Sequence, residues 1–126
     1  LHGFMRTGRD YNDIACHLRE QRRVIVPDIR GRGDSGYASD VDGYLLDSLL
    51  ADAWKILETL GEARVIILGT TLGAMMGMIM ANARPGSVAG VILIDQGTET
   101  AMEGVMRMFG HGGSEEMTYD EAVASV

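Results

Sequence analysis

The chain has 126 residues, and 46% of them are hydrophobic, which is enough for one small domain with a core of its own. Its 18 acidic and 11 basic side chains give a formal net charge of −7, so we expect neither a nucleic-acid partner nor an anionic membrane surface. The single cysteine, Cys16, excludes an internal disulfide and a cysteine-based metal site, and a reducing, cytoplasmic location is the natural expectation.

The first half of the chain predicts a helix, a strand, a loop and a second helix. The first helix is expected over Asp10–Glu20, with Asp10 or Asn12 able to cap its start. A short buried strand is expected next, over Arg23–Pro27, and Pro27 ends it. A loop rich in Gly, Asp and Ser comes next. Tyr44–Leu60 then carries leucines at helical spacing and ends at a glycine, Gly61, that is typical of a helix C-cap.

The second half predicts a strand over Val65–Leu68, a helix over Leu72–Ala83 and a strand over Val91–Ile94. The middle helix is apolar on nearly all sides, so we expect it to be largely buried. Strands that alternate with helices indicate an α/β fold with a parallel sheet. The uncharged run Val65–Ala83 is long enough to span a membrane, but its β-branched start and the break at residues 69–71 favour a strand, a turn and a helix.

The tail after the third strand has a different pattern. A helix is expected over Thr100–Phe109, and a capping box that begins at Thr118 predicts another. We therefore expect two parts, an α/β core over residues 1–97 and a helical tail over residues 98–126.

Residues 31–36 spell G-x-G-x-x-G, the outline of a dinucleotide-binding turn. Such a turn requires a strand directly before the first glycine and a helix at the third. Here Asp28-Ile29-Arg30 and residues 37–42 intervene, and no acid follows the next strand. We predict no cofactor at this loop. The Arg-Gly-Asp tripeptide inside the loop, at residues 32–34, is a short match of the kind that arises by chance.

Residues 69–73 read G-T-T-L-G between an expected strand and an expected helix. This is the spacing of a nucleophile elbow, in which the central side chain stands on a strained turn with its oxygen exposed. Thr71 takes the nucleophile position, and the backbone N–H of Leu72 is placed to meet a developing oxyanion. The glycines flank the turn because a side chain there would clash.

Two further motifs complete a resemblance. His2-Gly3-Phe4 precedes the first helix, and residues 28–35 read D-I-R-G-R-G-D-S. In this order the motifs resemble the N-terminal half of the α/β-hydrolase family, in its cap-bearing esterase, epoxide-hydrolase and C–C-hydrolase branch. The resemblance implies a partial hydrolase-like parallel sheet with flanking helices, followed by the start of a helical lid. It also implies an oxyanion hole from the N–H groups of Phe4 and Leu72, loop-shaping glycines at residues 31–36, and a small apolar ester-like ligand.

The chain also departs from that family. The family's nucleophile is Ser, Asp or Cys, whereas this chain has Thr71, a β-branched residue at a position that needs positive φ. The family's catalytic histidine and its usual late acid come after the end of this chain. His2 belongs to the oxyanion segment, His17 to the first helix and His111 to the tail. Asp95 stands where some members place their acid, although it can equally cap a loop. We therefore expect a serine-hydrolase-like domain that is inactive or incomplete as it stands.

The family's sheet order places one strand between Arg23–Pro27 and Arg64–Leu68, and only Leu1 remains of it. Unpaired sheet edges recruit other chains. The chain is therefore expected to be a fragment of a longer enzyme, in keeping with a start at Leu1 rather than Met, or to complete its sheet by strand exchange in a homo-oligomer. The alternative function is a non-catalytic module that binds a small apolar ligand through its nine methionines or assembles with itself.

Overall fold

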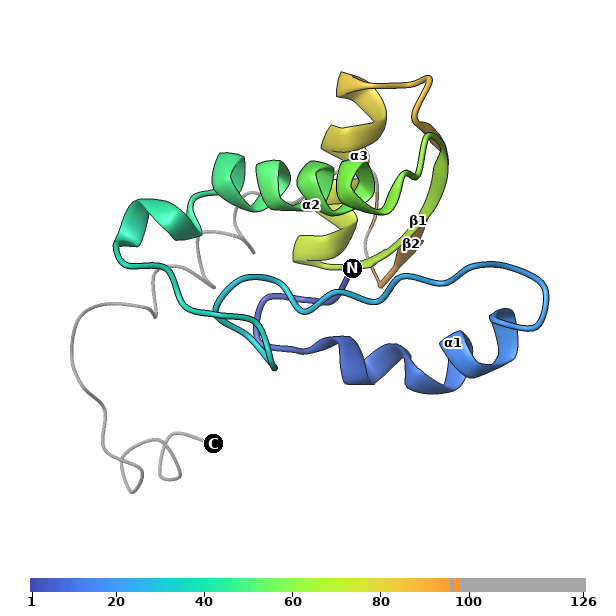
Figure 1. Ribbon diagram of the computed structural model, residues 1–126, viewed down its shortest axis with the longest axis horizontal. Helices are drawn as coiled ribbons and strands as arrows, with labels where there is room; N and C mark the ends of the chain where they lie inside the picture. Colours follow the sequence, from blue (N-terminus) through green and yellow to red (C-terminus); the bar gives the residue numbers. More distant parts are fainter. Residues whose placement is uncertain (96, 98–126) are drawn as a thin grey trace. The chain divides into compact units, whose positions relative to one another are not determined.

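The computed structural model describes residues 1–95 and 97 of the chain. The chain divides into two compact units, Leu1–Gln96 and Gly97–Val126, and the predicted helices of residues 98–126 lie outside the described residues. The elements are, in chain order, the 3-10 helix η1 (Gly8–Tyr11), α1 (Asn12–Leu18), the 3-10 helix η2 (Val41–Tyr44), α2 (Leu46–Leu60), β1 (Val65–Thr70), α3 (Leu72–Ala83) and β2 (Val88–Ile94) (Figure 1).

The predicted parallel α/β arrangement is confirmed. β1 and β2 form a parallel two-stranded sheet, and the helix between them, α3, packs on one of its faces. Ile67 of β1 and Val91 of β2 are register partners, and both contact α3 at Gly77, where an added Cβ would lie 3.0 and 2.9 Å from them. A side chain on Gly77 would hold the helix away from the sheet, so glycine permits the close packing.

The core forms where α2 and α3 meet the sheet. The most buried hydrophobic residues of this cluster are Ile29, Leu49, Ala53, Ile67, Met76, Met80 and Val88. Met76 and Met80 thus pack in the core, in keeping with the expected burial of this apolar helix. The predicted C-cap of α2 is also confirmed, because Gly61 adopts a left-handed φ of 71° and donates its N–H to Glu58.

The run Val65–Ala83, whose length alone would permit a membrane span, is divided between β1, a turn and the twelve-residue α3. Across residues 1–95 and 97, no helix combines the length and the apolar character needed to cross a bilayer.

The predicted strand over Arg23–Pro27 is wrong. This segment runs extended but does not belong to a sheet. A strand needs a hydrogen-bonding neighbour, and the neighbour expected here is reduced to Leu1. Leu1 itself pairs with β1 in the predicted way: its amino group donates to the Leu68 carbonyl (2.5 Å), and its carbonyl accepts the Thr70 N–H (3.1 Å).

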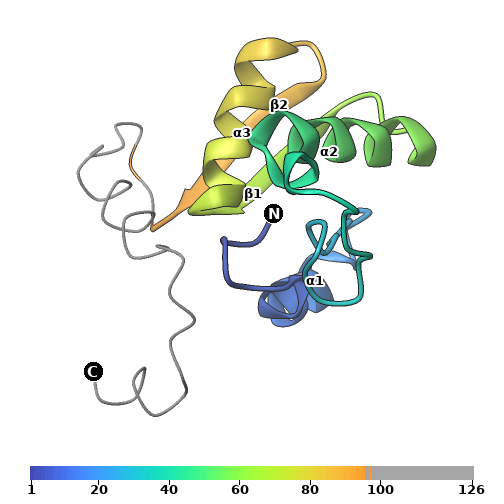
Figure 2. The same ribbon diagram turned by 90° about the vertical axis from the view of Figure 1, so that its left-hand side faces the viewer.

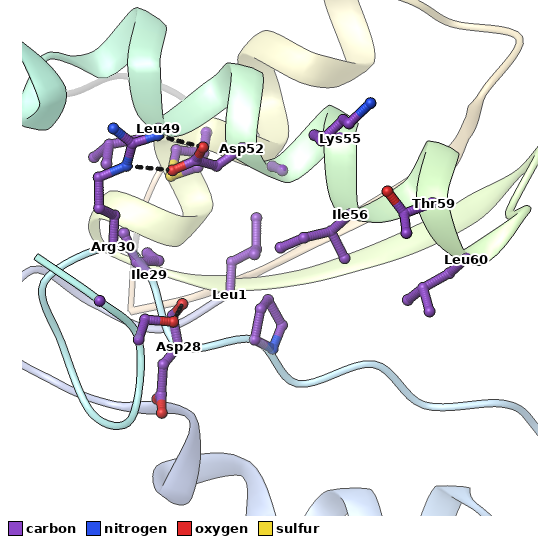
Figure 3. Close-up of a pocket in the computed structure, with 15 residues that line it drawn as sticks. Leu1, Asp28, Ile29, Arg30, Leu49, Asp52, Lys55, Ile56, Thr59 and Leu60 are labelled. Carbon is purple, nitrogen blue, oxygen red and sulfur yellow. Dashed lines mark hydrogen bonds and ion pairs between the residues drawn. The ribbon is translucent and has the colours of Figure 1, made fainter. Parts of the chain in front are cut away.

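A cavity of about 480 Å³ lies between α2 and the chain around residues 27–30 (Figure 3). Leu1, Ile29, Ala53 and Met76 contribute to its lining, whereas Thr71 does not. Figures 1 and 2 both place the chain's start between the β1–β2–α3 layers and the segment that carries α1. The cavity therefore borders the place where the missing strand was expected.

The first helix is shorter than predicted and begins differently. α1 covers Asn12–Leu18 and follows directly on η1. Its N-cap is Tyr11, which makes no side-chain capping bond, so the prediction of a cap from Asp10 or Asn12 is wrong. Asp10 instead forms an ion pair with Arg6 at 2.5 Å. Asp10 lies inside η1, one residue before the N-cap Tyr11, so it does not occupy the position from which a side chain caps α1.

Candidate functional site

The turn between β1 and α3 has the predicted strained geometry. Thr71 is the single residue between Thr70, which ends β1, and Leu72, which begins α3. Its φ of 45° and ψ of −107° lie where β-branched residues are genuine outliers. Backbone strain of this kind persists only where the surroundings impose it, and it concentrates at functional sites.

The two flanking glycines are required by close backbone packing, as the sequence predicted. An added Cβ at Gly69 would lie 2.5 Å from the backbone of Gly73. An added Cβ at Gly73 would overlap the carbonyl of Leu1. Both contacts would be closer than real Cβ atoms allow. The first turn of α3 therefore fits against β1 and Leu1 only because residues 69 and 73 have no side chain.

The segment His2-Gly3-Phe4 passes close to the Thr71 hydroxyl. An added Cβ at Gly3 would lie 2.6 Å from Thr71 Oγ1, so the hydroxyl points at the Gly3 backbone. Leu72, on the other side of Thr71, is the first residue of α3, and the N–H groups of a helix's first turn carry the positive end of its dipole. The structure thus places Thr71, Leu72 and the backbone of Gly3, the residue before Phe4, together at the start of α3.

His2 is fully buried, and both of its ring nitrogens are engaged. Nε2 accepts the Ile29 N–H at 2.8 Å, and Nδ1–H donates to the Gly3 carbonyl at 2.8 Å. These two bonds require the neutral ring, and burial lowers the pKa of His2 below its ordinary value. Because the Gly3–Phe4 peptide is planar and trans, fixing the Gly3 carbonyl also fixes the direction of the Phe4 N–H, which points the opposite way. His2 therefore holds the Gly3 carbonyl and the Ile29 N–H in place.

Three hydrogen bonds join the loop of residues 28–36 to the N-terminal segment of residues 2–8. The contacts are the Ile29 N–H on His2 Nε2, the Arg32 Nε–H on the Phe4 carbonyl (2.6 Å) and the Gly8 N–H on the Asp28 carboxylate (2.6 Å). Hydrogen bonds from the backbone N–H groups of Asp34 and Gly8 lower the pKa of Asp28. Gly31 and Gly33 adopt φ values of 73° and 54°, so these glycines shape the loop, as the resemblance implied.

Tyr11 contacts the end of β1, a contact that the sequence did not reveal. Its hydroxyl donates to the Leu1 carbonyl at 2.8 Å and lies 2.6 Å from Thr70 Oγ1. Since the Tyr11 proton is used on Leu1, the Thr70 hydroxyl is the donor in the second bond. An aromatic residue near a helix start was the only signal in the sequence.

Asp95 lies beside the elbow at the same edge of the sheet. The last register pair is Thr70 with Ile94, so Thr71 and Asp95 each follow a paired residue on adjacent parallel strands. Asp95 also has a positive φ, 53°, and it is exposed. The carboxyl ends of parallel strands are where ligands bind in α/β proteins.

The described residues supply no histidine base at this position. His2 is engaged on both nitrogens, and His17 is exposed on α1. His111 lies outside the described residues. No group of three or more His, Cys, Asp or Glu side chains within residues 1–95 and 97 could hold a metal ion.

A strained residue between a parallel strand and a buried helix has the strand–turn–helix geometry of the elbow in α/β-hydrolase folds. The chain belongs to the alpha/beta hydrolase fold family, whose sequence pattern matches residues 1–117.

Relatives and solved structures agree with this assignment. The chain is 34% identical to a 3-hydroxybutyrate-oligomer hydrolase of Cupriavidus necator and 30% identical to epoxide hydrolase 4 of Mus musculus, over 85% and 75% of its length. It is similar to the crystal structure of an alpha/beta hydrolase from Novosphingobium aromaticivorans, with a TM-score of 0.81 and 38% identity over 90% of the chain. The chain spans 36%, 26% and 40% of these three proteins.

Proposed function

We propose that this chain supplies the nucleophile and the oxyanion hole of an ester hydrolase. The observation that carries the proposal is the position of Thr71: a hydroxyl on a strained strand-to-helix turn, with its oxygen next to Gly3. Thr71 Oγ1 would attack an ester carbonyl carbon, and the carbonyl oxygen would become an oxyanion that accepts the N–H groups of Phe4 and Leu72.

The proton of the attacking hydroxyl must pass to a base, which later protonates the departing alkoxide. An unassisted hydroxyl is a weak nucleophile, and the described residues bring no available imidazole to Thr71. The methyl group of threonine also hinders attack. We therefore propose that the 126-residue chain turns over very slowly or not at all until a histidine is supplied by further sequence, with Asp95 as a candidate acid to orient it.

Short aliphatic esters are the proposed substrate class. The Cupriavidus relative is named for hydrolysing 3-hydroxybutyrate oligomers, and a hydroxyl nucleophile suits acyl transfer. A small apolar ester is the ligand that the sequence predicted.

The test compares Thr71→Ser, Thr71→Ala and the parent on a short-chain p-nitrophenyl ester, with the intact mass of each protein recorded. Thr59→Ser, at an exposed position of α2, is the matched control. Serine keeps the oxygen and removes the hindrance, so turnover in Thr71→Ser that is absent from Thr71→Ala would support the proposal. Equal background rates in all four proteins would show that this chain alone has no hydrolytic activity.

We also propose, as a second candidate function, self-association through the open face of the sheet. Ile66, Ile92 and Ile94 are 55%, 53% and 39% exposed, and they alternate with the side chains that contact α3. Parallel sheets are normally covered on both faces, and a second copy of this chain would cover this one. Sedimentation over a range of concentrations should show association that Ile92→Lys weakens. Val41→Lys, at an exposed site on η2, should leave it unchanged, and a monomer at every concentration would exclude the idea.

A further inference from the structure

Arg32 makes a contact that neither the loop motif nor the family assignment explains. It lies between Gly31 and Gly33 of the loop, and its side chain reaches across to Phe4. Its Nε–H donates to the Phe4 carbonyl at 2.6 Å, and its guanidinium carbon lies 4.9 Å from the centre of the Phe4 ring. Its Nη1 donates to the Arg30 carbonyl at 2.9 Å, which fixes the guanidinium from its other side. One side chain thus holds both the backbone and the ring of Phe4.

Arg30, whose carbonyl accepts the Arg32 hydrogen bond, is itself anchored to α2. Arg30 forms two hydrogen bonds to the Asp52 carboxylate, at 2.7 and 2.5 Å (Figure 3). Bidentate pairs of this kind fix geometry as well as charge. Arg32 therefore extends from a loop whose position is set by the helix behind it, and Phe4 is held relative to the body of the domain.

Hydrogen bonds fix both of the peptide planes that flank the Phe4 Cα. The plane before it contains the Gly3 carbonyl, which accepts His2 Nδ1–H at 2.8 Å and the Arg6 N–H at 3.2 Å. The plane after it contains the Phe4 carbonyl, which Arg32 holds. With both planes fixed, the φ and ψ angles of Phe4 are fixed, and so is the direction of its N–H.

We propose that Arg32 is a positioning residue for the oxyanion hole: by holding the carbonyl and ring of Phe4, it keeps this residue, and with it the Phe4 N–H, in one fixed position next to Gly3. The inference rests on the proposed function, because it assigns a purpose to Arg32 only if Phe4 is an oxyanion donor. Lysine cannot substitute, since it lacks the Nε–H, the second nitrogen and the planar face that together make these contacts.

The test uses Arg32→Lys and Arg32→Met, in the parent and in a Thr71→Ser background. Arg84→Met is the matched control, because Arg84 also stacks on an aromatic ring, with its guanidinium carbon 4.3 Å from the centre of the Trp54 ring. In the parent background, the carbonyl-carbon and amide resonances of Phe4 should shift in both Arg32 variants and not in Arg84→Met. Unmoved Phe4 resonances in the Arg32 variants would overturn the inference.

In the Thr71→Ser background, kcat for the ester should fall about tenfold to a hundredfold in both Arg32 variants with KM nearly unchanged, the loss expected when a donor is displaced rather than removed. Full rescue by lysine, or an unchanged kcat, would overturn the inference. If Thr71→Ser is silent, this chain alone has no hydrolytic activity, and the Phe4 resonances still decide whether Arg32 positions Phe4.

The hydrogen bond can also be measured without any substitution. In the unmutated chain, a through-bond coupling between Arg32 Nε and the Phe4 carbonyl carbon is expected. Its absence would overturn the inference even if the Arg32 variants do not fold.

Discussion

The carbonyl of Leu1 occupies the space that a side chain on Gly73 would need. That carbonyl cannot move aside easily, because it accepts the Thr70 N–H at 3.1 Å and the Tyr11 hydroxyl at 2.8 Å. The beginning of the chain, the end of β1 and the first turn of α3 are therefore packed together directly behind Thr71.

Gly73→Ala should destabilise the protein strongly. The added methyl group meets backbone atoms of Leu1, which cannot rotate away as a side chain can, so we expect a loss of about 3 kcal/mol, at the upper end of overpacking costs. Gly86→Ala is the control, because an added Cβ there meets nothing within 4 Å, and its effect should be within about 0.5 kcal/mol. Urea unfolding midpoints compare the two. Equal midpoints would show that Leu1 does not occupy this place in solution.

Tyr11→Phe should cost about 1–2 kcal/mol of unfolding free energy, because it removes one hydroxyl and leaves the Leu1 carbonyl and the Thr70 hydroxyl with one partner fewer. Tyr37→Phe is the matched control, since Tyr37 is 84% exposed and its hydroxyl is free to bond water. Urea unfolding again gives the comparison. A Tyr11→Phe variant as stable as Tyr37→Phe would contradict the network.

Most of the fold was accessible from the sequence, because it depends on local patterns. The spacing of apolar residues located α2 and α3, Gly61 marked a helix end, and β-branched runs marked β1 and β2. The segment Arg23–Pro27 has the same strand-like composition and still forms no strand. Whether a strand forms depends on a neighbour, and that neighbour is not a property of the segment's own residues.

The candidate site was also predictable only where it depends on local sequence. The spacing of residues 69–73 predicted the position and strain of Thr71, because the strain arises within the turn itself. The contacts of Tyr11 with Thr70 and of Arg32 with Phe4 could not be predicted, since each joins segments separated by 28 or more residues and depends on how those segments pack. Long-range packing decides which side chain reaches the site.

Thr71→Gly should stabilise the protein, although it removes the proposed nucleophile. Strain at such a position costs on the order of 1–3 kcal/mol for a β-branched residue, and glycine relieves it at a smaller cost in chain entropy, so we expect a net gain of about 1 kcal/mol. Thr59→Gly, within α2, should have the opposite sign. The measurement is the urea midpoint of each variant. A loss of stability in Thr71→Gly would show that contacts of the Thr71 side chain outweigh its strain.

His2 makes the stability depend on pH, and the direction follows from its environment. Burial lowers the pKa of His2 in the folded protein below the ordinary value of 6.5, so the unfolded chain binds a proton first as the pH falls. The stabilisation is complete above the unfolded pKa and is lost as the pH drops below about 6.5, with a slope of at most about 1.4 kcal/mol per pH unit. Protonation also ends the ability of Nε2 to accept the Ile29 N–H.

His2→Gln should flatten this part of the profile, at the cost of lower stability near neutral pH. The Leu1 amino group, whose pKa burial lowers to about 6, also destabilises the fold as the pH falls, but it is present in both proteins and cancels from their difference. His17→Gln, at an exposed position of α1, is the matched control. Urea unfolding between about pH 5 and pH 8 tests the prediction, because that range brackets the ordinary histidine pKa. If the parent and His2→Gln lose stability in parallel as the pH falls, His2 is not held neutral between Ile29 and Gly3.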